Sequence, residues 1–153
     1  PLPPDWAAHL RQRTTQALDE ELEAIAGAVA AVGAVIAAGL PNCVVGQSRR
    51  QRIELSLQQV GLSETFAGRI YSTHDLGKPK PAPDIYLQAA ADFKTPPERI
   101  TVIEDTVTGV AGGTAAGMRV LGYVADGTPG SLQAAGAVLE FDNMDHLPGL
   151  LGL

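Results

Sequence analysis

Three groups of polar residues could carry out chemistry together, because each group follows a short apolar run of the sequence. They are Gly46, Gln47 and Ser48; Lys78 and Lys80 in a proline-rich loop; and Glu104 with Asp105. Adjacent carboxylates suit Mg²⁺, which usually takes one or two protein carboxylates and completes its shell with water or phosphate. A lysine in a stiff loop supplies a point charge for an anion, and helix N-termini supply backbone N–H groups. Metal, lysine and N–H groups are what phosphoryl transfer requires.

Each group also has a purely structural interpretation. Glu104 and Asp105 could cap a helix, Lys80 could be an ordinary surface lysine, and Ser48 could be an N-cap. Cys43 lies inside an apolar run and is expected to be a core residue, not a nucleophile. Taken one at a time, the residues leave these alternatives open.

Alternating strand and helix patterns predict the elements that position the three groups. Strands are expected at residues 42–46, 69–72, 100–103, 119–124 and 137–141. Helices are expected within residues 5–24 and at 28–38, 49–60, 84–91 and 107–116. Short apolar strands that alternate with helices indicate an α/β fold with a parallel sheet covered on both faces. Ligands of such sheets bind outside the carboxyl ends of the strands, where the three polar groups are predicted to lie.

The composition limits the classes of partner. The chain has 153 residues, 45% of them hydrophobic, and its formal charge is 11 − 17 = −6. An acidic chain is a poor match for nucleic acid or for an anionic membrane, so neither is expected as a partner. Residues 24–40 carry no charge, but they are rich in alanine and glycine and predict a buried helix, not a membrane span. The single cysteine closes no internal disulfide, and we expect a reducing, cytoplasmic location.

Two motifs resemble those of the haloacid dehalogenase-like (HAD) hydrolases, in particular the phosphatase and β-phosphoglucomutase branch with a small helical cap. Residues 80–86 read Lys-Pro-Ala-Pro-Asp-Ile-Tyr, and residues 102–110 read Val-Ile-Glu-Asp-Thr-Val-Thr-Gly-Val, followed by Ala-Ala-Gly-Met at 115–118. The resemblance covers most of residues 25–125. It implies a Rossmann-like core, Lys80 as the catalytic lysine that contacts the phosphate and the nucleophile, and Glu104 and Asp105 as Mg²⁺ ligands. It also implies attack by an aspartate on phosphorus, giving an aspartyl-phosphate that water hydrolyses.

The sequence departs from the family pattern at two places. The family's phosphate-binding Ser or Thr falls at Gly46, so that the expected phosphate contacts are the N–H groups of Gly46 and Gln47, Ser48 two residues on, and Lys80. The family's first motif, an Asp-x-Asp after the first strand, has no match. Asp5 follows prolines and Asp19 lies in an acidic helical stretch, so neither is carried over as the nucleophile.

The missing motif predicts an incomplete sheet. In the family the first strand lies centrally, between the strands matched here by residues 42–46 and 101–103. Without it, two strand edges would leave buried polar groups unpaired, at a cost of roughly 1–3 kcal/mol for each group. We therefore expect residues 1–24 to be a remnant of a helical cap and residues 25–153 to be an incomplete core. A missing N-terminal segment or a second chain would complete the sheet.

The resulting functional hypothesis is Mg²⁺-dependent hydrolysis of a small phosphorylated metabolite, such as a sugar phosphate, with the nucleophile outside this chain. The chain alone is then expected to be inactive. The alternatives are a phosphomutase of the β-phosphoglucomutase type and a non-catalytic homologue that only binds phosphate. A nucleotide-binding oxidoreductase is disfavoured, because Gly109, Gly112, Gly113 and Gly117 do not have GxGxxG spacing.

Overall fold

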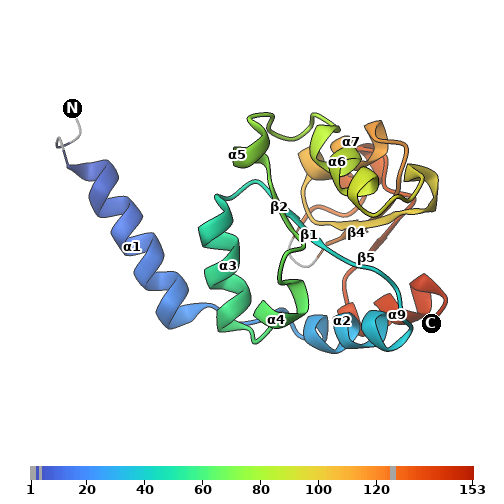
Figure 1. The fold of residues 1–153 in the computed structure, drawn as a ribbon, viewed down its shortest axis with the longest axis horizontal. Coiled ribbons are helices and arrows are strands. Elements are labelled where there is room, and N and C mark those ends of the chain that lie inside the picture. The colour runs from blue at the N-terminus through green and yellow to red at the C-terminus, as the bar shows by residue number, and fades with distance from the viewer. Residues whose placement is uncertain (1–2, 4, 125–126) are drawn as a thin grey trace.

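The computed structural model describes residues 3, 5–124 and 127–153, and its helices and strands follow the predicted alternation (Figure 1). The longer helices are α1 (Trp6–Glu21), α2 (Ala28–Ala37), α3 (Arg50–Gln59), α6 (Asp84–Asp92) and α7 (Val107–Ala115). Shorter ones are α4 (Ser63–Phe66), α5 (Thr73–Leu76), α8 (Ser131–Ala134) and α9 (Leu147–Leu151), with 3₁₀ turns at Pro97–Arg99 and Met144–His146. The strands are β1 (Val44–Gly46), β2 (Ile70–Ser72), β3 (Thr101–Glu104), β4 (Arg119–Tyr123) and β5 (Leu139–Phe141).

All the strand pairs are parallel, and they form two separate sheets within the described residues. Strand β1 pairs with β2, and β3, β4 and β5 pair in that order. Short strands joined by helices favour parallel pairing, because the crossover helices bury both faces of the sheet. The α/β, Rossmann-like fold class is therefore confirmed, with no strand pairing β1 to β3 in the part of the chain that the structure describes.

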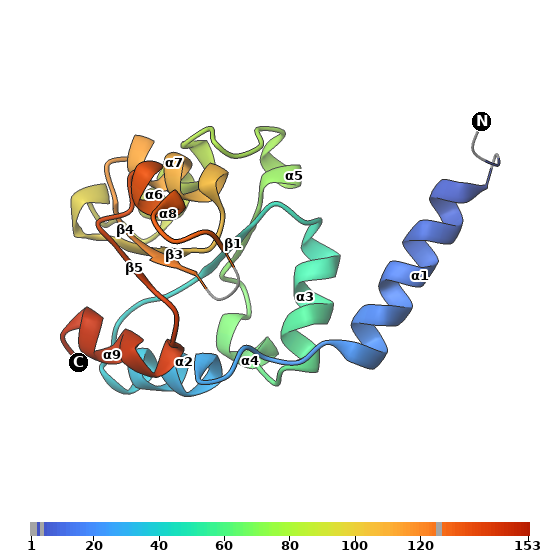
Figure 2. The same ribbon diagram turned by 180° about the vertical axis from the view of Figure 1, so that it is seen from behind.

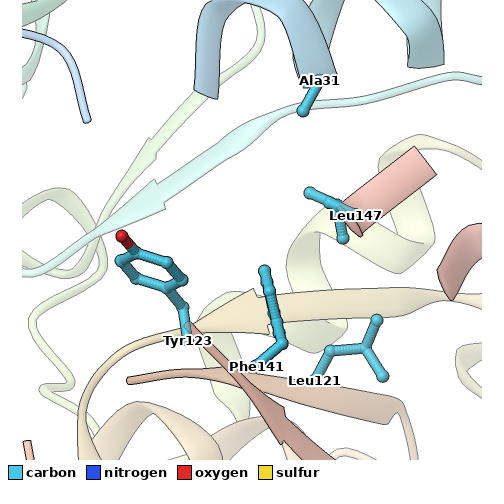
Figure 3. Packing of buried hydrophobic residues seen from close by; sticks show 5 residues of the cluster. All are labelled: Ala31, Leu121, Tyr123, Phe141 and Leu147. Carbon is cyan, nitrogen blue, oxygen red and sulfur yellow. The ribbon is translucent and has the colours of Figure 1, made fainter. Parts of the chain in front are cut away.

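Helices cover both faces of the strands (Figures 1 and 2). On one face, α2 and α9 lie side by side and pack on β4 and β5 through the cluster in Figure 3, which comprises Ala31, Leu121, Tyr123, Phe141 and Leu147. On the other face lie α6, α7 and α8. Neighbouring strand residues divide between the faces as a pleated strand requires: Val120 packs with Val110 of α7, and Leu121 packs with Ala31 of α2.

Helix α1 extends away from the rest of the molecule (Figures 1 and 2) and contacts α3. It comprises most of the segment predicted to be a cap remnant, and residues 1, 2 and 4 of that segment lie outside the described residues. No helix within the described part of the chain is both long enough and apolar enough to cross a membrane.

Glu140 anchors the start of α8 from the neighbouring strand. Its carboxylate accepts hydrogen bonds from the backbone N–H groups of Gly130 (2.6 Å), Leu132 (2.7 Å) and Gln133 (3.0 Å). These donors favour the ionised carboxylate, so they lower the pKa of Glu140 below its ordinary value, with the Gly130 N–H contributing most. Ionised Glu140 therefore stabilises the folded chain.

Replacing Glu140 by glutamine is expected to lower the Tm at pH 7. Because the pKa of Glu140 is lower in the folded chain, its contribution is fully present above about pH 4.5 and is lost as the pH falls through the folded-state pKa. The difference in Tm between wild type and Glu140→Gln should therefore shrink below about pH 4.5, as followed by circular dichroism. Glu54→Gln, an exposed position on α3, is the control. A Tm difference that does not depend on pH would contradict this role.

Candidate active site

A buried ion pair joins the second and third polar groups. Lys80 and Glu104 are each 9% exposed, and Nζ of Lys80 donates to Oε1 of Glu104. The same Nζ lies 3.4 Å from the carbonyl oxygen of Val45 in β1 and 5.2 Å from the centre of the Tyr86 ring. Lys80 is therefore a buried cation held between the ends of β1 and β3, and the surface-lysine interpretation is wrong for it.

The neighbouring lysine has a different environment. Nζ of Lys78 pairs with the carboxylate of Asp84 at the molecular surface, where the Lys78 side chain is 61% exposed. Lys78 and Lys80 share one proline-rich loop, and only the second points into the buried site. This agrees with the motif match, which places the family's lysine at Lys80.

Both carboxylate oxygens of Glu104 have partners. Oε1 accepts from Lys80 and from the hydroxyl of Tyr86 at 2.7 Å, and Oε2 accepts from the hydroxyl of Thr106 at 3.1 Å. The carboxylate also lies against the first turn of α7, at the α-carbon of Gly109, where a β-carbon would overlap it. Glu104 is thus fixed in place as the counter-ion of Lys80.

Tyr86 is the buried residue that sequence reasoning did not assign a role. It is 2% exposed, and its hydroxyl lies within hydrogen-bond distance of Glu104 and of the carbonyl oxygen of Gly109 (3.0 Å). Burial raises the pKa of Tyr86 far above its ordinary value, and the negative charges of Glu104 and Asp105 raise it further. The hydroxyl therefore stays protonated as a donor. The one feature of the sequence that could have indicated a role for Tyr86 is its position as the last residue of the motif at residues 80–86.

The loop after β1 contacts the lysine loop and the end of β2. Oε1 of Gln47 accepts a hydrogen bond from the backbone N–H of Lys80 at 3.1 Å. The hydroxyl of Ser72, which is 1% exposed, donates to the carbonyl oxygen of Ser48 at 2.7 Å. The structure therefore brings the predicted groups at 46–48, 80 and 104–105 to one end of the strands. The phosphate-binding role of Gly46, Gln47 and Ser48 stays a prediction.

Asp105 is the carboxylate that remains available at this end. It is exposed and makes no hydrogen bond or ion pair with the described residues, and it directly follows the fixed Glu104. No group of three or more potential metal ligands exists among the described residues. This donor set fits a Mg²⁺ ion that takes Asp105, with Glu104 beside it, and draws its other ligands from phosphate and water.

A cavity separates the two sheets and extends to Glu104. It has a volume of about 450 Å³ and runs between β1 and β3, and we call it the inter-strand cavity. Val45 of β1 and Val102 of β3 line its sides, Ala31 of α2 and Leu147 of α9 line one face, and Tyr86 of α6 lines the other. The gap expected between these two strands is therefore present as a mainly apolar cavity, and Glu104, the partner of Lys80, lines it at the end of β3.

Comparison with known proteins identifies the family. The family model described as haloacid dehalogenase-like hydrolase matches residues 3–123, which is most of the chain. The protein belongs to the haloacid dehalogenase-like hydrolases. It is 31% identical over 116 residues to 6-phosphogluconate phosphatase of Escherichia coli, with 76% of this chain and 51% of that protein covered.

Solved structures of this family show the same fold. A HAD family hydrolase of Deinococcus radiodurans, solved with bound phosphate and sodium, is 36% identical and superposes with a TM-score of 0.87, covering 98% of this chain and 68% of that one. A β-phosphoglucomutase-like protein of Thermotoga maritima superposes with a TM-score of 0.88 at 21% identity, covering 97% and 68%, which shows the fold alone. This HAD-like chain spans about half the length of the curated phosphatase that it matches.

Proposed function

We propose that this HAD-like chain forms the larger part of a Mg²⁺-dependent phosphatase that hydrolyses a small phosphorylated metabolite through an aspartyl-phosphate. The observation that carries the proposal is the position of Lys80, a buried cation between β1 and the end of β3 whose backbone N–H donates to Gln47 of the 46–48 loop. Such a cluster stabilises negative charge on a phosphoryl group. We also propose a reducing, cytoplasmic setting, because Cys43 has no second cysteine to pair with.

The chain's own residues would divide the work of binding phosphate, positioning Lys80 and holding Mg²⁺. Lys80 would contact a phosphate oxygen and the attacking carboxylate, Glu104 would hold Lys80 in place, and the loop at 46–48 would donate backbone N–H groups to phosphate. Asp105, with Glu104 beside it, would hold Mg²⁺, which when bound neutralises negative charge on the phosphoryl group.

The nucleophilic aspartate is proposed to come from outside residues 1–153. The facing edges of β1 and β3 are unpaired within the described residues, and the cavity between them is lined by Glu104, the partner of Lys80. A strand placed there would pair with both edges, and its carboxyl end would lie beside Lys80. We call residues 1–153 joined to the segment that supplies this strand the completed protein.

A sugar phosphate or a similar small molecule is the proposed substrate class, because the E. coli relative is named a 6-phosphogluconate phosphatase. A phosphomutase on the same site is the alternative activity. The two are separated by incubating the completed protein with a sugar phosphate and Mg²⁺. Release of inorganic phosphate supports the phosphatase, and conversion to an isomeric sugar phosphate without release supports the mutase.

Gly46 favours one further alternative, a homologue that binds phosphate without turning it over. No hydroxyl is present at this position, and a β-carbon here would lie 2.8 Å from Cδ1 of Ile53, the flexible end of that side chain. A serine at 46 therefore fits once Ile53 is shortened to valine.

The variant Gly46→Ser/Ile53→Val tests what the absent hydroxyl costs. In the completed protein it should raise kcat/KM for p-nitrophenyl phosphate about tenfold or more, because a hydrogen bond to a charged group is worth about 1.5–3 kcal/mol. Ile53→Val alone is the control and should leave kcat/KM unchanged. If the completed protein is inactive both with the wild-type sequence and with Gly46→Ser/Ile53→Val, the result would instead support the non-catalytic alternative.

A further inference from the structure

Asn42 is a polar residue of the inter-strand cavity with an unused hydrogen-bonding atom. Its side-chain Oδ1 is buried and has no hydrogen-bond partner among the described residues. A buried acceptor without a donor destabilises the folded state, so native proteins rarely retain one. The atom therefore indicates that a donor is missing at this point of the cavity.

The orientation of the Asn42 amide is fixed by its own neighbours. Its Nδ2 donates to the carbonyl oxygen of Leu40 at 3.0 Å, and its backbone oxygen accepts from Arg69 at 3.3 Å. Because Nδ2 is engaged with Leu40, the acceptor Oδ1 is the atom left over. Asn42 comes two residues before β1, whereas Glu104 is the last residue of β3, so Asn42 lies toward the amino end of the cavity and Glu104 toward the carboxyl end.

The cavity is shaped for an extended segment. Strands β1 and β3 have three and four residues, so a strand of about four residues, about 13 Å long, would match them. Asn42 and Glu104 line its two ends, and helices α2 and α9 on one face and α6 on the other supply apolar contacts. A segment buried on both faces needs apolar side chains at successive positions.

We infer that Asn42 is the docking residue for the segment that enters the inter-strand cavity: its Oδ1 accepts a backbone N–H at the amino end of an extended, apolar strand that runs parallel to β1 and β3. The inference rests on the proposed function, because this segment is the one proposed to carry the nucleophilic aspartate. It adds a recognition residue at the end of the cavity opposite the chemistry, and it sets the register in which the aspartate reaches Lys80.

A binding assay without Mg²⁺ or phosphate tests this inference separately from the activity. The probe is a fluorescein-labelled synthetic peptide, Lys-Lys-Ala-Val-Ile-Val-Asp, and its binding to residues 1–153 is followed by fluorescence anisotropy. Three further peptides each carry one N-methylated backbone amide, at the alanine, at the first valine or at the isoleucine. Each methyl group removes a single N–H donor. Asn42→Ala should weaken binding of the unmethylated peptide about five- to tenfold, as expected for one hydrogen bond.

The decisive result is the combination of the two changes. One of the methylated peptides should bind wild type more weakly by the same factor, and Asn42→Ala should bind that peptide and the unmethylated one equally. Asn143→Ala is the matched control, because Asn143 caps a 3₁₀ turn through the N–H of Asp145 and does not line the cavity. It should leave the affinity unchanged. No binding of the peptide, or equal binding by wild type and Asn42→Ala, would overturn the inference.

A second measurement covers the case in which a variant does not fold alone. The peptide sequence is joined to residue 1 through a Gly/Ser linker, and urea unfolding of the fusion is compared with and without Asn42→Ala. The fusion is expected to lose stability on Asn42→Ala. In a second fusion, the strand residue whose N-methylation weakens peptide binding is replaced by proline, and there Asn42→Ala is expected to cause no further loss of stability. Equal losses in both backgrounds would contradict docking at Asn42. Activity plays no part in either readout, so a failed phosphatase assay leaves them interpretable.

Discussion

Replacing Gly109 by alanine is expected to lower the free energy of unfolding by about 3–5 kcal/mol, although alanine normally stabilises a helix. Gly109 lies in the first turn of α7, and an added β-carbon would overlap the carboxylate of Glu104. The carboxylate must then move away from Lys80, which leaves a buried lysine without its counter-ion. Breaking a buried pair costs this much, against a total stability of roughly 5–15 kcal/mol. Urea unfolding followed by circular dichroism measures it.

Gly33→Ala is the matched control for this substitution. Gly33 lies in α2, and a β-carbon there would meet no atom within 4 Å. The control should therefore stabilise the chain by about 0.5–1 kcal/mol through the ordinary preference of helices for alanine. If Gly109→Ala were also stabilising, Glu104 could not be packed against α7 as described.

The second large effect is expected from the ion pair itself. Lys80→Met and Glu104→Leu should each lower the free energy of unfolding by about 3–5 kcal/mol, because each leaves one buried charged partner uncompensated. The double variant Lys80→Met/Glu104→Leu should cost much less than the sum, since apolar residues can replace a buried pair at little cost. All three should abolish turnover by the completed protein. Denaturant unfolding and p-nitrophenyl phosphate hydrolysis give the two readouts.

The surface pair of the same loop supplies the control. Lys78→Met breaks the pair with Asp84, which lies at the surface, where solvent screens the interaction. Its Tm and its turnover should both stay close to wild type. Additive losses in the Lys80 and Glu104 double variant, or an equal effect of Lys78→Met, would show that the buried pair has no special role.

The sequence was sufficient to predict most of the architecture. The expected helices at 28–38, 49–60, 84–91 and 107–116 correspond to α2, α3, α6 and α7, and all five strands lie where apolar runs predicted them. These segments have clear periodicity and clear ends. Helices α4, α5, α8 and α9 were not predicted, because four or five residues are too few to show a helical period and tertiary contacts stabilise them.

The site was predictable in its members but not in its contacts. The alternation of strands and helices placed Lys80 and Glu104 at the same end of the sheet, and the structure pairs their side chains. What the sequence could not show is that Glu104 uses both oxygens within the protein, through Tyr86 and Thr106, since these bonds depend on how α6 and α7 pack together. The gap between β1 and β3 was expected from the absent first motif. Its unpaired acceptor at Asn42 becomes visible only in three dimensions.

We propose that residues 1–153 hold a phosphoryl-transfer site whose nucleophile comes from outside them. Mg²⁺-dependent hydrolysis of p-nitrophenyl phosphate, measured side by side for residues 1–153, the completed protein and its Lys80→Met variant, tests it most directly. We expect turnover by the completed protein alone, and none by the 153-residue chain or by Lys80→Met. Turnover by the purified 153-residue chain, or an active Lys80→Met variant of the completed protein, would contradict it.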